Sequence, residues 1–322
     1  ARSIVMSSDG ETFYATGTEG KIISSRLSDK DAVEVIGSNR YPNRKLLLSA
    51  DEQWLVNASD SSSLQVYNVA VPGGAPRRIE GHASFVNDLH PSGNYFYSVG
   101  ADRQIRRNNF ESGASELIVT TAEEFKTIDI SSVGRWLYGG TLSGKVVRVD
   151  LANRREDQVI FTQPDIPIHA LSISPDDTRL AIGDELGMMH IMDLSWASLK
   201  DEVTTHRGRI SAMEFSKDGK LLATASLDGS LVIWETDKWS EIPIRITNND
   251  SYVWDATFSP SGDYLIAACG DGDIRIWPTR PELMAGELCQ YLKANLTMAE
   301  WNKYIGDEIG YETTCENIKS QP

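Results

Sequence analysis

The sequence repeats one short unit seven times at an interval of about 42 residues. Each copy contains a tight turn just before an apolar run, and the gaps between successive turns are 42, 41, 41, 43, 42 and 43 residues. A period of roughly 40–45 residues with turn and strand composition indicates a radial array of β-sheets. We call the residue at the centre of each turn the anchor residue, and the seven anchors are Gly10, Glu52, Gly93, Gly134, Asp177, Gly219 and Gly262.

The two clearest copies, residues 215–234 and 258–277, each read as three short strands separated by Gly-containing turns. Asp-Gly pairs between β-rich runs are hairpin signals. A fourth, looser strand is predicted at residues 32–37, 115–120, 158–163 and 242–247. Because a thin four-stranded sheet cannot bury both its faces alone, the units are expected to pack against one another around an axis.

One copy carries a more specific pattern. Residues 206–234 contain a His, Phe-Ser-Lys-Asp-Gly, Leu-Ala-Thr-Ala-Ser-Leu-Asp-Gly and Val-Ile-Trp. This segment resembles the WD-repeat β-propeller family, and so do residues 250–277, with Asn249 in the place of the His. The resemblance implies an all-β fold, a single seven-bladed propeller of four-stranded antiparallel blades over residues 1–278. The predicted blades are 1–39, 40–80, 81–122, 123–164, 165–206, 207–249 and 250–278.

In the sixth unit, the resemblance implies a buried hydrogen-bond network. It would run from His206 through Asp228 and a strand hydroxyl, either Thr224 or Ser226, to Trp234. His, Asp and Ser together also suggest a catalytic triad. We favour the structural role, because the hydroxyl lies in mid-strand and the network ends on an indole. The other units lack the full pattern, so we expect them to depend mainly on apolar packing.

After Trp277 the pattern becomes helical. Apolar residues at helical spacing from Leu283 to Leu296 predict a first helix, and Thr297-x-x-Glu300 predicts the start of a second, which carries Trp301, Tyr304 and Ile305 and ends at Gly306. Residues 279–322 are therefore a predicted helical tail that packs on the propeller. The segment 288–315 resembles the C-terminal extension of bacterial WD-repeat proteins, in which the propeller is often the C-terminal part of a larger signalling chain. The resemblance implies an upstream STAND-type NTPase, protease-like or kinase module.

Composition narrows the class of partner and compartment. The chain has 46 acidic and 31 basic residues and a net charge of −15, which disfavours nucleic acid and anionic membranes. Three cysteines give no disulfide framework and favour a reducing, cytoplasmic location. Because the sequence begins inside a repeat, we expect a longer bacterial parent with an upstream domain.

The residues with catalytic potential form no recognised site. The histidines other than His206 lack metal-ligand spacing, and Asp271-Gly272-Asp273 is interpreted as a β-turn rather than a calcium site. We therefore predict no cofactor, no metal and no enzymatic activity, and favour a protein-interaction, sensor or scaffold module. The alternatives are a lactonase- or dehydrogenase-like propeller enzyme with a channel active site, or a structural assembly subunit.

Counting back eight residues from each anchor gives one residue per blade, just inside the first strand of that blade. Together these residues form a candidate binding face. In the family, this region borders the mouth of the central channel. The residues are Arg2, Arg44, Asn87 (after a shift in the third unit), Lys126, His169, Ser211 and Trp254. Converging cations in a concave mouth bind anions well, so this face is a candidate site for an acidic peptide or a phosphate. The predicted partner is a protein or peptide, with an acidic one as the candidate for this face.

The closure of the seventh blade is left open by the sequence. Residues 2–8 already form an inner strand of the first blade, and no earlier residues are present to supply an outer strand to the last one. Blade seven then has three strands, or the tail covers its edge, or upstream residues complete it. Since an open edge promotes aggregation, we expect the tail helices to shield it.

Overall fold

The computed structural model describes residues 1–29, 32–239, 241–247, 249–289, 291–292, 294–304, 310–313 and 315. The chain divides into two compact units, Ala1–Ile276 and Trp277–Pro322, which are described separately. None of the helices within the described residues is long and apolar enough to cross a membrane.

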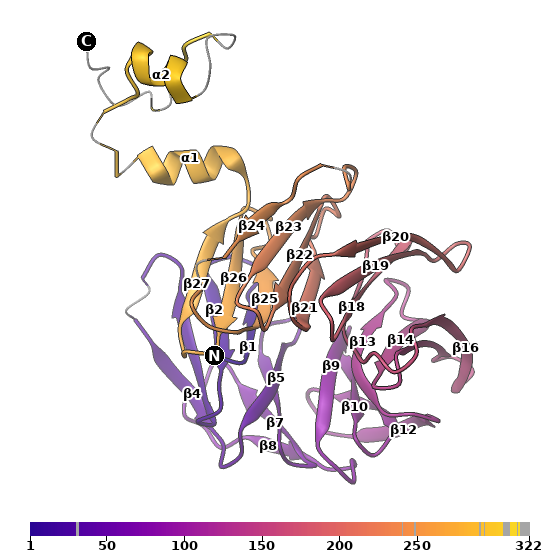
Figure 1. The fold of residues 1–322 in the computed structure, drawn as a ribbon. Helices are drawn as coiled ribbons and strands as arrows, with labels where there is room; N and C mark the ends of the chain where they lie inside the picture. The colour runs from indigo at the N-terminus through magenta and orange to yellow at the C-terminus, as the bar shows by residue number, and fades with distance from the viewer. Residues whose placement is uncertain are drawn as a thin grey trace. The chain divides into compact units, whose positions relative to one another are not determined.

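Seven antiparallel sheets follow the seven sequence units, and Figure 1 shows them arranged around a common centre. We number them as blades one to seven in chain order. Blades one to three contain β1 (Ser3–Met6), β2 (Thr12–Thr16), β3 (Lys21–Arg26), β4 (Glu34–Ser38), β5 (Asn43–Leu48), β6 (Trp54–Ser59), β7 (Leu64–Asn68), β8 (Arg77–Ile79), β9 (Val86–Ser92), β10 (Tyr95–Gly100), β11 (Gln104–Asn109) and β12 (Ser115–Thr120).

Blades four to six contain β13 (Phe125–Ile130), β14 (Trp136–Thr141), β15 (Lys145–Asp150), β16 (Arg155–Thr162), β17 (Ile168–Ile173), β18 (Arg179–Asp184), β19 (Met188–Asp193), β20 (Ser198–Thr204), β21 (Ile210–Phe215), β22 (Leu221–Ser226), β23 (Leu231–Glu235) and β24 (Ile244–Ile246). Blade seven contains β25 (Val253–Phe258), β26 (Tyr264–Cys269) and β27 (Ile274–Pro278). The predicted all-β seven-bladed propeller with a short helical C-terminal extension is confirmed.

The seven anchor residues share one backbone conformation. All have a positive φ, between 57° at Glu52 and 75° at Gly262. Glycine adopts this left-handed region freely, whereas other residues do so at a cost. The two carboxylate exceptions bond to the preceding blade: Glu52 accepts from the Ser8 amide, and Asp177 accepts from the Ser132 amide at 2.8 Å. The required turn geometry therefore explains the regular spacing of the anchors.

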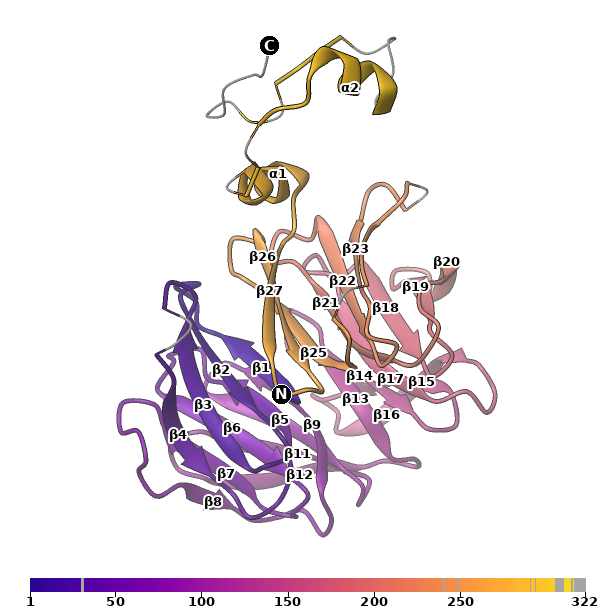
Figure 2. The ribbon, with the colours of Figure 1, turned by 60° about the vertical axis from the view of Figure 1, so that its left-hand side comes forward.

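Apolar side chains fill the space between neighbouring blades. Phe96 of blade three is fully buried in a cluster that includes Val56 of blade two. The ring closes in the same way, because Phe13 of blade one and Ile266 of blade seven share a buried cluster. Figure 2 shows the orange strands of blade seven beside the indigo strands of blade one. Packing between adjacent sheets, rather than within any one sheet, thus forms the core.

Side chains of the innermost strands also bond to the backbone of the next blade. Asp88 of β9 accepts from the Ile128 amide at 2.9 Å, and Asp129 of β13 accepts from the Ile173 amide at 2.6 Å. These bonds satisfy buried polar groups and fix the relative position of adjacent blades. Two hydroxyls act similarly, with Leu46 donating to Ser3 and Phe215 donating to Ser172, both at 3.1 Å.

Blade seven differs from the others in having three strands within the described residues, in the order β25-β26-β27. Completion of this blade by upstream residues stays a prediction. Shielding of the blade by the tail stays a prediction, as does the packing of the tail on the propeller.

The tail contains α1 (Pro281–Cys289) and α2 (Met298–Tyr304). Thr297 and Glu300 cap α2 reciprocally, since the Thr297 amide donates to the carboxylate at 2.9 Å and the Glu300 amide donates to the hydroxyl at 3.3 Å. Trp301 of α2 packs edge-on against Tyr311, with ring centroids 5.4 Å apart. The predicted members Ile305 and Gly306 lie outside the described residues.

Two expectations for the tail were wrong. Cys289 and Cys315 form a disulfide, although the cysteine count indicated no disulfide framework, while Cys269 is free and buried. The first helix ends at Cys289 instead of continuing to Leu296. Beyond this helix, the Asn295 side chain binds both the amide and the carbonyl of Cys315, at 2.8 and 2.9 Å.

Candidate functional site at the channel mouth

The structure brings the seven predicted face residues together. All seven line a central cavity of about 480 Å³, and each lies at or just before the start of an innermost strand. Because every blade begins its inner strand at the same end of the ring, one residue from each converges on one opening. Their use as a binding face is not shown by this placement and is taken up below. The lining residues at this level are Arg2, Arg44, Asn87, Lys126, His169, Ser211 and Trp254.

Acidic residues that the sequence analysis did not select accompany the cations at the mouth. Arg44 forms an ion pair with Asp60, and Lys126 forms one with Glu124. Asn87 donates to the same Glu124 carboxylate at 2.8 Å. These acids lie outside the eight-residue register, so counting back from the anchors could not find them. The two cations are therefore already partly neutralised.

His169 is not one of the cations at neutral pH. Burial lowers the pKa of its imidazole, and the charge of Arg209 lowers it further, to about 4. The nearby Glu185, whose Oε2 lies 2.6 Å from Nε2, opposes this effect without outweighing it. The basic character of the mouth therefore rests on arginine and lysine.

Two guanidinium groups lie over one half-buried aromatic ring. The Cζ atoms of Arg2 and Arg209 are 5.1 and 5.9 Å from the Trp254 ring centroid. Tyr252, which is 58% exposed, contacts the same indole edge-on. Among the described residues, no carboxylate forms an ion pair with either arginine. Burial lowers the pKa of Arg2, and repulsion from Arg44 adds to that effect. This part of the mouth is aromatic and cationic.

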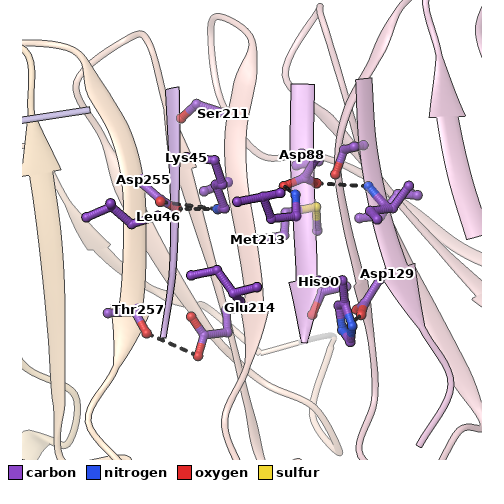
Figure 3. A pocket seen from close by; sticks show the side chains of 18 of the residues that line it. Lys45, Leu46, Asp88, His90, Asp129, Ser211, Met213, Glu214, Asp255 and Thr257 are labelled. Carbon is purple, nitrogen blue, oxygen red and sulfur yellow. Dashed lines mark hydrogen bonds and ion pairs between the residues drawn. The ribbon is translucent and has the colours of Figure 1, made fainter. Parts of the chain in front are cut away.

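Deeper in the channel, the lining becomes mixed in charge. Lys45 Nζ lies 3.2 Å from Asp255 Oδ2, and Figure 3 shows Asp88 on the other side of the same lysine. Burial lowers the pKa of Lys45, but the two carboxylates outweigh it and raise that pKa above its ordinary value. Glu214 is less well compensated, with a 3.4 Å bond from Thr257, and burial raises its pKa to about 8.

One histidine–carboxylate pair in the channel interior has a structural role. His90 Nε2 pairs with Asp129 at 2.8 Å, but Asp129 also accepts the Ile173 amide, so the pair connects blades. Within the described part of the chain, no group of three or more His, Cys, Asp or Glu residues is arranged to hold a metal ion.

In the turn before β27, the Asp271 and Asp273 carboxylates both pair with Arg275, at 2.7 and 3.4 Å.

The predicted network of blade six is present in part. His206 Nε2 lies 2.8 Å from the Thr224 hydroxyl, so Thr224 rather than Ser226 is the strand partner. Asp228 acts mainly through Ser230, a residue the sequence analysis missed: His206 Nδ1 lies 2.6 Å from Ser230 Oγ, and that hydroxyl donates to Asp228 at 2.6 Å.

Two predicted members, Ser226 and Trp234, take no part in this hydrogen-bond network among the described residues. Ser226 instead bonds to the Gly208 carbonyl at 3.0 Å. The buried indole N–H of Trp234, expected to complete the network, has no hydrogen-bond partner among the described residues. Burial raises the pKa of Asp228, but hydrogen bonds from His206 and Ser230 outweigh it and lower that pKa below its usual range.

Other blades contain related networks, so the expectation of mainly apolar packing there needs correction. In blade three, His82 Nδ1 lies 3.0 Å from Asp102, His82 Nε2 lies 2.8 Å from Ser98 Oγ, and Asn108 donates to that hydroxyl at 2.9 Å. Asn108 occupies the position of the family Trp, and its amide replaces the indole N–H as the donor. In this chain the position supplies a donor to the strand hydroxyl in blade three but not in blade six, where the Trp234 N–H has no partner among the described residues.

The comparisons with known proteins agree with this geometry. The family model "WD domain, G-beta repeat" matches residues 74–106, 197–235 and 242–278. Three segments of the chain thus match this family, and the seven-bladed fold agrees with the match. Proteins of this class are typically interaction scaffolds and generally not enzymes.

Similar curated proteins are eukaryotic. The chain is 31% identical over 115 residues to Protein LST8 homolog from Drosophila melanogaster, covering 33% of this chain and 36% of the relative. It is 25% identical over 187 residues to the serine-threonine kinase receptor-associated protein of Gallus gallus, covering 58% and 53%. The chain thus spans about a third to a half of these two relatives. They give no support to the expected bacterial signalling context.

Proposed function

We propose that this chain is a non-enzymatic interaction scaffold that binds an acidic protein segment at the channel mouth. The observation that carries the proposal is the placement of Arg2 and Arg209 over Trp254 without a carboxylate partner among the described residues. A peptide carboxylate can form charge-assisted bonds with a guanidinium while its neighbouring side chain packs on the Tyr252 ring beside Trp254.

The surroundings of this site support a protein ligand. The mouth is held by rigid inner strands, and arginine, tyrosine and tryptophan are the residue types that dominate interface energetics. The net charge of −15 repels acidic molecules elsewhere on the surface, so a local cationic mouth favours binding in one place.

A peptide-display selection against the full chain tests the proposal. The selected peptides should be acidic, and the double variant Arg2→Glu, Arg209→Glu should bind them at least tenfold more weakly. Arg44 and Lys126, which already pair with acids, should matter less. The matched control is Lys217→Glu, Lys220→Glu, because both lysines lie beside the Gly219 anchor, at the opposite end of strand β21 from the mouth. Selection of neutral or basic peptides, or equal binding by the mouth variant, would contradict the proposal.

The tail supports a narrower proposal, that the chain is the C-terminal, partner-sensing part of a larger bacterial signalling protein. The residues that carry the resemblance to bacterial extensions fold the tail: Asn295 holds Cys315, and Trp301 packs on Tyr311. The reading frame upstream of residue 1 in the parent gene tests this, since a preceding NTPase or effector domain is expected and a eukaryotic gene would exclude it.

A further inference from the structure

The charges at the channel mouth are arranged unevenly, so the mouth can select the direction in which a segment binds. We propose, in an inference that rests on the proposed function, that the acidic segment also carries one lysine or arginine, which pairs with Glu185 of blade five. The acidic residue of the same segment then binds Arg2 beside Trp254. The partner is thus a segment with both charges in a fixed order, rather than a uniformly acidic one.

Glu185 reaches the mouth from the hairpin between β18 and β19. It is the first residue after the second strand of its blade, and Asp60 holds the equivalent place in blade two. Each carboxylate contacts the mouth residue of its own blade: Asp60 pairs with Arg44, and Glu185 Oε2 lies 2.6 Å from His169 Nε2. Blade two therefore supplies an internal reference for the carboxylate of blade five.

The two pairs differ in charge. The guanidinium of Arg44 is always protonated, so the Asp60 carboxylate has a full counter-charge. An imidazole is mostly neutral at pH 7, and burial together with the charge of Arg209 lowers the pKa of His169 further. Among the described residues, no lysine or arginine forms an ion pair with Glu185. Glu185 thus keeps a negative charge that no direct contact neutralises.

Glu185 is also accessible to a ligand. Its side chain is 45% exposed, which is more than those of Asp60 and Glu124, the two acids that pair with mouth cations. The next residue, Leu186, is 57% exposed, so apolar surface lies beside the carboxylate. Lysine and arginine bury their apolar stems while their charged ends stay in water. This combination therefore suits a long basic side chain.

Glu185 and Arg2 lie on different sides of the opening. The innermost strands contact one another in chain order, and β25 contacts β1, so blade five lies across the ring from blades one and two. Arg2 belongs to blade one, and the charge of Arg44 in blade two is close enough to lower its pKa. On the side of Glu185, by contrast, Lys126 of blade four is held by Glu124. The mouth therefore has a cationic side and an acidic side.

A segment with one charge of each sign has a preferred direction in such a mouth. In that direction both charges face an opposite charge, whereas in the reverse direction each faces a like charge, which opposes binding. Arg209 and Lys126 also act on His169, so they are cations of this chain that could compete for Glu185. The experiment must therefore separate a role in holding Arg209 from a role in binding the ligand.

The peptide-display selection described for the proposed function also tests the direction, because the two proposals predict different features of the same peptides. The selected acidic peptides should carry a lysine or arginine at a constant spacing and always on the same side of the acidic residues. Acidic peptides without such a basic residue would overturn the direction alone. Peptides that are not acidic would overturn the proposed function, and the direction with it.

A double-mutant cycle with one selected peptide then assigns the basic residue to Glu185. Replacing that residue by glutamine in the peptide, or changing Glu185→Gln in the full chain, should each weaken binding roughly tenfold. The two changes together should weaken it no further than either alone. Losses that multiply would mean that Glu185 acts on Arg209 or on folding, and they would overturn the proposal.

Glu202→Gln is the matched control for this cycle. Glu202 is also 45% exposed and lies 3.6 Å from another histidine of blade five, His190. It belongs to β20, the outermost strand of that blade, away from the inner strands that line the mouth. The Glu202→Gln chain should bind both forms of the peptide as the wild type does. A tenfold loss in this variant as well would show that the effect is not specific to the mouth and would overturn the assignment.

Discussion

Asp255 on the last blade accepts a hydrogen bond of 2.8 Å from the hydroxyl of Ser3 on the first blade, across 252 residues of sequence. The same carboxylate accepts the Ile4 amide at 3.3 Å and pairs with Lys45 of blade two. One buried acid therefore joins three blades at the point where the ring closes. Because blade seven has no fourth strand among the described residues, this contact and the apolar cluster around Phe13 hold the closure.

Asp255→Ala should destabilise the whole propeller. The change leaves the Ser3 hydroxyl and the Ile4 amide without an acceptor and removes the nearest carboxylate from Lys45, so the free energy of unfolding should fall by about 3 kcal/mol. Urea denaturation measures this. Asp273→Ala, which removes an exposed carboxylate in the same blade, is the control and should change stability by less than about 0.5 kcal/mol. Equal effects of the two changes would remove the special role assigned to Asp255.

Glu214 should make the propeller less stable as the pH rises. Burial raises its pKa to about 8 in the folded chain, so the folded state holds the proton more tightly than the unfolded state does. Stability is therefore present in full below pH 4.5 and is lost as the pH approaches 8. Glu214→Gln should remove this loss, on the order of 4 kcal/mol at pH 8, with no gain near pH 4.5.

Thermal unfolding of both proteins at several pH values measures this difference. Glu111→Gln, at an exposed turn, is the control. A constant offset between Glu214→Gln and the wild type at every pH would show that the substitution acts through packing instead.

His82→Ala and His206→Ala should each cost about 2 kcal/mol of stability, because each leaves a buried strand hydroxyl without its partner. The two costs should add in the double variant, since the residues lie in blades three and six. Chemical denaturation of the single and double variants gives both numbers. A negligible cost for His82→Ala would mean that only the blade with the full family pattern depends on its network.

The disulfide should stabilise the tail and leave the propeller unchanged. Cys289 and Cys315 are 26 residues apart, and opening such a loop typically costs about 3 kcal/mol. In the double variant Cys289→Ser, Cys315→Ser, the tail amides should lose protection from hydrogen exchange while the main unfolding transition of the propeller keeps its midpoint. A shift of that midpoint by several degrees would show that the two units are energetically coupled.

The sequence predicted the features that depend on backbone geometry. The anchors were found because a left-handed residue is needed at each turn, and even Glu52 and Asp177 keep that conformation. The repeat spacing also predicted that Arg2 and Trp254 lie at one opening, because each blade starts its inner strand at the same end of the ring.

The features that depend on pairs of side chains were not predicted. Asn108 takes over the donor role of a Trp, and Glu124 and Asp60 neutralise mouth cations from positions outside the repeat register. The disulfide was missed because cysteine number says nothing about which two sulfur atoms the fold brings together. Pairing between distant segments is decided by tertiary structure, which a single repeat pattern does not encode.

The unequal polar networks of the blades have a consequence for how the chain assembles. Because the repeats are similar, the chain could misfold into a propeller in which a strand from one unit joins the sheet of another. In blade two, Asn57 donates to Asn43 at 2.8 Å, whereas blade six uses His206 with Thr224 and blade three uses His82 with Ser98. An exchanged strand would leave buried donors and acceptors without matching partners. Because the networks differ, each strand satisfies its polar groups only in its own blade, and the correct order of strands has the lowest free energy.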